Sequence, residues 1–136
     1  MIGRRLKNSK IEISRGWDIV HDVFYDLDPW SNSSSNKAKD DDLKEDLLLM
    51  AWKNYHLDLG WYSTPTGDVF QLFLFHGIDW HNCHLLEKRR ITNYNVLVET
   101  TNAFIKNVEL DKYKSIDYEY KSIDEYSHVE TVITIE

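Results

Sequence analysis

The sequence predicts an α+β fold: an antiparallel sheet of about four to six strands with two helices packed on one face. Residues 55–91 contain three strand-like segments that are rich in aromatic side chains and separated by glycine-containing turns. Two other segments, 43–54 and 93–108, space their apolar residues as amphipathic helices do. The 136 residues, 42% of them hydrophobic, suit a single domain over 1–136 with its own core.

The block 55–91 predicts three consecutive strands. Its first strand, 55–62, alternates polar residues with an apolar set, which is Tyr55, Leu57, Leu59 and Trp61. A turn at 66–68 leads into 69–76, whose residues are apolar on both faces and therefore predict a central strand of the sheet. A tight corner at 77–80 separates this strand from a third one over 83–90.

Both predicted helices begin with a capping residue. Asp42 and Glu45 have the spacing of a capping box before the segment 43–54. The apolar stripe of this first helix is Leu43, Leu47, Leu48, Met50 and Ala51. Thr92 or Asn93 caps the second helix, over 93–108. Its stripe is Tyr94, Leu97, Val98, Thr101, Phe104, Ile105 and Val108.

Residues 11–28 alternate with period two, which favours one or two strands. The apolar side is Trp17, Ile19, Val23, Tyr25 and Leu27, and the opposite side carries four aspartates. Val20 and Phe24 interrupt the alternation and leave a short helix as an alternative. Pro29 ends the segment, and residues 1–10 and 31–41 are polar stretches that we expect to be flexible.

The apolar stripes and the central strand together predict which side chains form the core. The predicted core residues are Trp17, Leu59, Trp61, Leu72, Leu74, Leu97 and Ile105.

Charge and composition restrict the class of function. The formal net charge is −7, which argues against nucleic-acid and anionic-membrane binding, because phosphates require Lys and Arg. No segment approaches the roughly 20 apolar residues of a membrane span. No apolar run follows the basic N-terminus as in a secretory signal, so we expect a cytoplasmic protein. Cys83 is the single cysteine, so no internal disulfide forms.

The densest group of reactive side chains lies in the string HGIDWHNCH, which holds His76, Asp79, His81, Cys83 and His84. On a strand, however, His81 and Cys83 share one face while His84 points to the other. No second cluster completes a set of four ligands at the spacing of a structural zinc site. We therefore expect no metal, no cofactor and no enzyme activity, and a small metal-dependent hydrolase using His76, Asp79, His81 and His84 is the alternative.

The scattered histidines and the internal basic run are predicted to be solvated, or to cap the backbone in the case of the histidines. His21 and His56 each lie one or two residues from an aspartate, but adjacent residues of a strand point to opposite faces, which counts against His–Asp pairs. The run Glu87–Arg90 is the only internal basic cluster, and we interpret it as a solvated strand end.

The segment 109–136 differs from the rest because it holds eight acidic and three basic residues with tyrosines between them. Such carboxylates could complement a basic groove while the tyrosines act as rigid anchors. A solvated charged face is the alternative, and 128–135 has strand character. The residues predicted to bind a partner are Asp111, Asp117, Tyr118, Glu119, Tyr120, Asp124 and Glu125.

Several short segments together resemble one protein family. They are Gly16–Ile19, Phe24–Pro29, Glu45–Leu48, Asp58–Tyr62, the Gly67-Asp68 turn and Asp79-Trp80. This set resembles an immunity-protein family of bacterial contact-dependent growth inhibition and related polymorphic toxin systems. The segment after residue 109 lies outside the resemblance.

The resemblance implies a small cytoplasmic protein that binds and neutralises the toxic C-terminal domain of a secreted effector, often a nuclease. It implies no catalytic residues. From the charge we expect no nucleic-acid or membrane partner, and we take a monomer bound to the toxin as the default. Because toxin-contacting residues vary in such families, none is transferred to this chain. An adaptor for a different basic protein is a further alternative.

Overall fold

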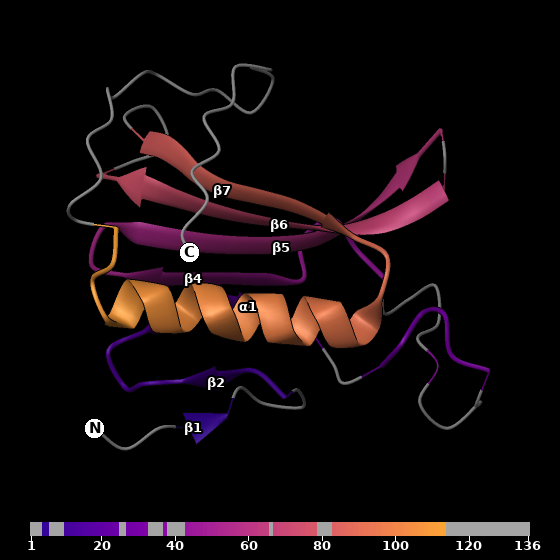
Figure 1. Cartoon of the computed structure of the whole chain (residues 1–136), viewed down its shortest axis with the longest axis horizontal. Coiled ribbons are helices and arrows are strands. Elements are labelled where there is room, and N and C mark those ends of the chain that lie inside the picture. Colours follow the sequence, from indigo (N-terminus) through magenta and orange to yellow (C-terminus); the bar gives the residue numbers. More distant parts are fainter. Residues whose placement is uncertain are drawn as a thin grey trace.

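The computed structural model (Figure 1) describes residues 4–5, 10–24, 27–32, 37, 43–65, 67–78 and 83–113, with Arg4 and Arg5 described as backbone only. In this part of the chain, a short two-stranded sheet precedes a five-stranded antiparallel sheet and one helix. In chain order the elements are β1 (Arg4–Arg5), β2 (Glu12–Ile13), β3 (Asp18–Asp22), β4 (Leu48–Trp52), β5 (Tyr55–Thr64), β6 (Gly67–Gly77), β7 (Cys83–Ile91) and α1 (Tyr94–Glu109).

The large sheet is a meander in which strands adjacent in the chain pair with one another, in the order β3-β4-β5-β6-β7. The helix α1 lies along this sheet, and β2 with its partner β1 lies beside the helix on the side away from β4 in Figure 1. We call the face of the sheet towards α1 the inner face and the opposite one the outer face.

The pairing of β5 with β6 fixes which residues reach the inner face. Ten consecutive pairs run from Tyr55 opposite His76 to Thr64 opposite Gly67, without a shift in register. A loop of two residues joins these strands, and Gly67 after it has a positive φ of 126°, which glycine adopts readily. The predicted strands 55–62 and 69–76 are confirmed, and β6 has a neighbouring strand on each side.

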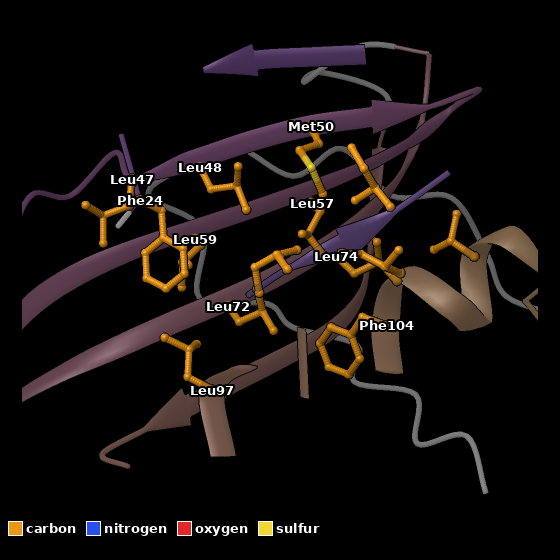
Figure 2. Packing of buried hydrophobic residues seen from close by; sticks show 14 of the residues in the cluster. Phe24, Leu47, Leu48, Met50, Leu57, Leu59, Leu72, Leu74, Leu97 and Phe104 are labelled. Atoms are coloured by element: carbon orange, nitrogen blue, oxygen red, sulfur yellow. The ribbon is translucent and has the colours of Figure 1, made fainter. Parts of the chain in front are cut away.

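Leucines on β5 and β6 form the centre of the core. Figure 2 shows Leu57, Leu59, Leu72 and Leu74 together between the sheet and the helix, and each is 0% exposed. Of the seven predicted core residues, six are buried. Trp61 is only half-buried, because it lies at the border of the core, with its ring centroid 4.9 Å from Phe70 and 5.4 Å from Trp30.

The helix predicted over 43–54 is wrong, because Leu48–Trp52 is strand β4. Lys53, with a positive φ of 53°, lies in the two-residue turn that pairs Trp52 with Tyr55. Leu48 and Met50 are buried while Leu49 and Ala51 are half-buried, which is the period of a strand. The α+β class and the antiparallel sheet are therefore confirmed, and the described residues contain one helix instead of two.

The second predicted helix is confirmed as α1. The side chain of Asn93 caps it by accepting a hydrogen bond from the Val96 amide at 3.1 Å. The residues of the predicted stripe are buried, apart from Val98, which is partly buried against the same core. No helix in the described ranges combines the length and apolar character that crossing a membrane requires.

The segment 11–28 contains two strands, β2 and β3, which agrees with the predicted one or two strands. The predicted apolar side is not buried throughout, because Ile19 on β3 is 39% exposed. Val20, which interrupts the pattern, lies where the register of β3 against β4 shifts: Ile19 pairs with Met50, and His21 pairs with Leu49. A β-bulge therefore accounts for the irregular sequence pattern.

Side chains of α1 hold the N-terminal strand in place. The side-chain amide of Asn102 accepts a hydrogen bond from the Glu12 amide at 2.9 Å and donates to the Lys10 carbonyl at 3.4 Å. Near the end of the helix, the Glu109 carboxylate accepts from the Ser14 amide at 3.3 Å and from Trp17 Nε1 at 3.0 Å. These four polar contacts from two side chains of the helix fix β2 and the turn after it.

We expect Leu59→Ala to lower the free energy of unfolding by about 2–5 kcal/mol, because it leaves a cavity between β5 and α1. Urea unfolding followed by circular dichroism measures this change. The control is Ile78→Ala, since Ile78 is 80% exposed, and we expect it to change stability by less than about 0.5 kcal/mol. Equal stability of the two variants would contradict the packing described above.

Candidate partner-binding surface

Of the residues predicted to bind a partner, the structure describes Asp111, and the other six lie outside the described residues. Asp111 is exposed, follows the end of α1 and has a positive φ of 58°. Its charge reaches His76: burial and the neighbouring His56 lower the pKa of His76, and Asp111 opposes this shift. Asp111 therefore lies near the end of β6, on the described surface.

Tyr113, which the composition groups with the acidic segment, is buried at the end of the described chain. Its hydroxyl donates to the Glu87 carboxylate at 3.2 Å, and Arg89 Nη2 donates to the same carboxylate at 2.9 Å. Burial raises the pKa of Glu87, and burial beside Glu87 raises the pKa of Tyr113. This group ties the chain after α1 to β7.

The interpretation of Glu87–Arg90 as a solvated strand end is wrong for Glu87 and Arg89. Glu87 is 2% exposed, and the guanidinium of Arg89 lies over the ring of Phe104 at 5.5 Å. A shift in the β6–β7 register explains this burial, because Leu86 and Glu87 together occupy the place opposite Leu74. The bulge brings the carboxylate to the inner face, where it meets Arg89 and Tyr113.

The candidate metal ligands are only partly described. His76 lies opposite His84 across β6 and β7, and Cys83 lies opposite Gly77. Asp79 and His81 lie outside the described residues. His76 packs on an aromatic ring, with its centroid 4.5 Å from that of Tyr55. Among the side chains that the structure describes, no three His, Cys, Asp or Glu residues are grouped so that they could hold a metal ion.

The other two described histidines contact backbone carbonyls. His21 Nε2 lies 3.0 Å from the Asp46 oxygen, and His56 Nε2 lies 3.0 Å from the Gly77 oxygen. Each contact joins two segments that are distant in the sequence. Both imidazoles therefore contact the backbone, whereas the sequence favoured solvated or capping histidines.

Three carboxylates gather near the outer face of β5. The chain before β4 continues beside β5, with the Trp61 amide donating to the Lys44 carbonyl at 2.8 Å. This path requires Gly60, because a Cβ atom there would lie 2.0 Å from the Glu45 carbonyl oxygen. Glu45 and Asp46 are thereby held next to the strand that carries Asp58.

These carboxylates produce a negative potential at the outer face. Burial, and to a smaller extent the charge of Asp46, raises the pKa of Asp58 to about 6. Burial also raises the pKa of Tyr62 to about 12, with contributions from Asp58, Glu45 and Asp46. Because Leu57 and Leu59 on either side of Asp58 face the helix, the Asp58 side chain belongs to the outer face.

Strand β3 borders this group of carboxylates. His21 of β3 contacts Asp46, and Leu49, which pairs with His21, also pairs with Asp58. We call β3 together with Glu45, Asp46 and Asp58 the acidic edge. It was not predicted as a site from the sequence, although the bulge at Val20 had a visible signal in the broken alternation.

We expect Asp58→Asn to stabilise the protein at pH 7 by roughly 2 kcal/mol, since the raised pKa makes ionisation of Asp58 costly in the fold. The stability that protonated Asp58 contributes is complete below its unfolded-state pKa of 3.8 and is lost as the pH rises through about 6. The advantage of the variant should therefore disappear near pH 4. Urea unfolding of both proteins across this range measures it, and a pH-independent difference would contradict the assignment.

No protein-family model matches the chain, and neither a curated protein nor a solved structure matches it.

Proposed function

We propose that the protein binds and neutralises the C-terminal toxin domain of a cognate contact-dependent growth inhibition effector, with a nuclease as the expected toxin chemistry. The observation that carries the proposal is the acidic edge. There, after burial, the negative charges of Asp58, Glu45 and Asp46 all help to raise the pKa of Tyr62. A surface of this sign complements a cationic protein. The resemblance described under Sequence analysis supports the same partner.

A nuclease domain suits such a surface because its substrate site must present Lys and Arg to phosphates. An acidic protein that covers this site blocks the substrate by occupancy and needs no chemical step of its own. In this proposal the protein acts as a monomer in the cytoplasm. There it binds the toxin domain before that domain binds nucleic acid. It takes no cofactor and contacts neither nucleic acid nor membrane.

Two carboxylates of the described interior, Glu87 and Glu109, make structural contacts, as expected of a rigid binding protein. Glu87 is engaged by Arg89 and Tyr113, and Glu109 holds Ser14 and Trp17. These contacts fasten α1 and the N-terminal strand to the rest of the domain. Rigid scaffolds of this kind present a surface at low entropic cost on binding.

Cells that produce the toxin domain encoded beside this chain should survive only when they also produce this protein. Purified toxin domain and purified protein should form a one-to-one complex in size-exclusion chromatography. Because opposite charges steer the encounter, the association rate should fall as ionic strength rises, with little effect on dissociation. Full toxicity in the presence of the protein, or an association rate independent of salt, would contradict the proposal.

The sequence also predicts that the acidic segment after α1 contributes to binding. Neutralising Asp117, Glu119, Asp124 and Glu125 together should lower the association rate, measured by stopped-flow fluorescence. Replacement of Tyr118 or Tyr120 by Ala should instead raise the dissociation rate, because an aromatic anchor acts after docking.

A deletion that tests this segment must begin at residue 114, because Tyr113 is buried against Glu87 and its loss would disturb the fold. Unchanged protection and affinity in a folded variant lacking 114–126 would show that this segment is a solvated face. Binding would then depend on the described surface alone.

A further inference from the structure

We infer that β3 is the docking strand of the acidic edge, and that an extended, lysine- or arginine-rich segment of the partner protein pairs with it as an additional antiparallel strand. The inference rests on the proposed function for the identity of the partner. The proposed strand pairing is argued independently, from the position of β3 in the sheet and from the exposure of its side chains.

The two edges of the large sheet differ in exposure. Among the described strands, β3 is the first in the sheet order, and Asp18 to His21 are all exposed. Strand β7 is the last, and its residues from Cys83 to Glu87 are all buried. Since an edge strand presents backbone donors and acceptors along its length, the exposed side chains of β3 mark the accessible edge.

Strand β3 also displays apolar side chains where a soluble edge normally carries charge. Val20 is 65% exposed and Ile19 is 39% exposed. They are adjacent, and the bulge at Val20 directs this side chain away from the regular ladder. Added strands take their affinity from main-chain hydrogen bonds and their specificity from side-chain contacts of this kind.

Charge decides which kind of strand fits. Asp18 and Asp22 lie at the two ends of β3, and Asp18 is exposed on the outer face. Asp58 lies on the same face one strand beyond β4, and the Asp46 backbone contacts His21 of β3. A strand that carries Lys or Arg beside small apolar residues complements this arrangement. Opposite-charge pairs across strands are favourable, and like charges are not.

The same charges argue against a second copy of this chain as the occupant. An antiparallel self-pairing centred on Val20 would place Asp18 of one copy opposite Asp22 of the other, twice. Like charges directly opposite one another destabilise a pair of strands. The charges of β3 therefore disfavour pairing with a second copy of this chain and favour pairing with a basic strand.

The test uses the full-length protein and two synthetic eight-residue peptides, one alternating Lys with Val and one alternating Glu with Val. With peptide at about 1 mM, only the Lys-Val peptide should bind, with a dissociation constant that rises as salt is added. Amide hydrogen exchange followed by NMR should slow at residues 18–22 and stay unchanged in β7. Slowing at other positions, or equal binding of the two peptides, would overturn the inference.

Matched substitutions separate the edge from general surface charge. Val20→Lys should weaken binding of the Lys-Val peptide by about tenfold or more, because it places a like charge on the docking strand. Val96→Lys is the control, since Val96 is a similarly exposed valine on α1, and its binding should equal that of the wild type. Equal loss in both variants would assign the effect to net charge and contradict docking on β3.

The same hydrogen-exchange measurement with the toxin domain in place of the peptide is an independent test. If it binds and protection from exchange falls on β3, both proposals stand. If it binds and protection falls elsewhere, the function stands and the docking strand is wrong. If it does not bind, the function fails, and the peptide result alone decides whether β3 accepts a basic strand.

Discussion

The register between β5 and β6 is the constraint on which the rest of the structure depends. Ten uninterrupted pairs place every second residue of both strands on the inner face, which collects the leucines beneath α1. A slip of one residue would exchange Leu57 and Leu59 for His56 and Asp58 at the core. The same register therefore determines that Asp58 lies on the outer face, next to Asp46.

Buried or half-buried carboxylates have two different uses in this fold. Glu87 is enclosed by Arg89 and Tyr113 and joins β7 to the end of α1. Asp58, by contrast, has no such compensation, and its burial, with a smaller contribution from the charge of Asp46, makes its ionisation costly. Residues that conflict with stability in an otherwise consistent fold are expected at functional surfaces. This contrast, together with the exposed apolar residues of β3, favours the acidic edge as a binding surface.

The sequence predicts the elements whose periodicity has a single interpretation. Alternation over 55–62 and the helical stripe after Asn93 identify β5 and α1, because neither pattern fits the other kind of element. The run from Leu47 to Met50 fits both periods, and the choice depends on a turn at Lys53 and on pairing with β5. The burial of Glu87 could not be predicted from the sequence either, because it depends on a bulge and on Tyr113, 26 residues away. The acidic edge forms only when 45–46, β3 and β5 meet.

Residue-by-residue hydrogen exchange of the unbound, full-length protein tests most directly whether β3 is an accessible edge. We expect the slowest exchange in β5 and β6, whose amides pair with strands on both sides. Amides of β3 that point away from β4 should exchange faster by several orders of magnitude, because they open without unfolding the domain. Exchange in β3 as slow as in β5 throughout would show that its edge is already paired, and would contradict the account.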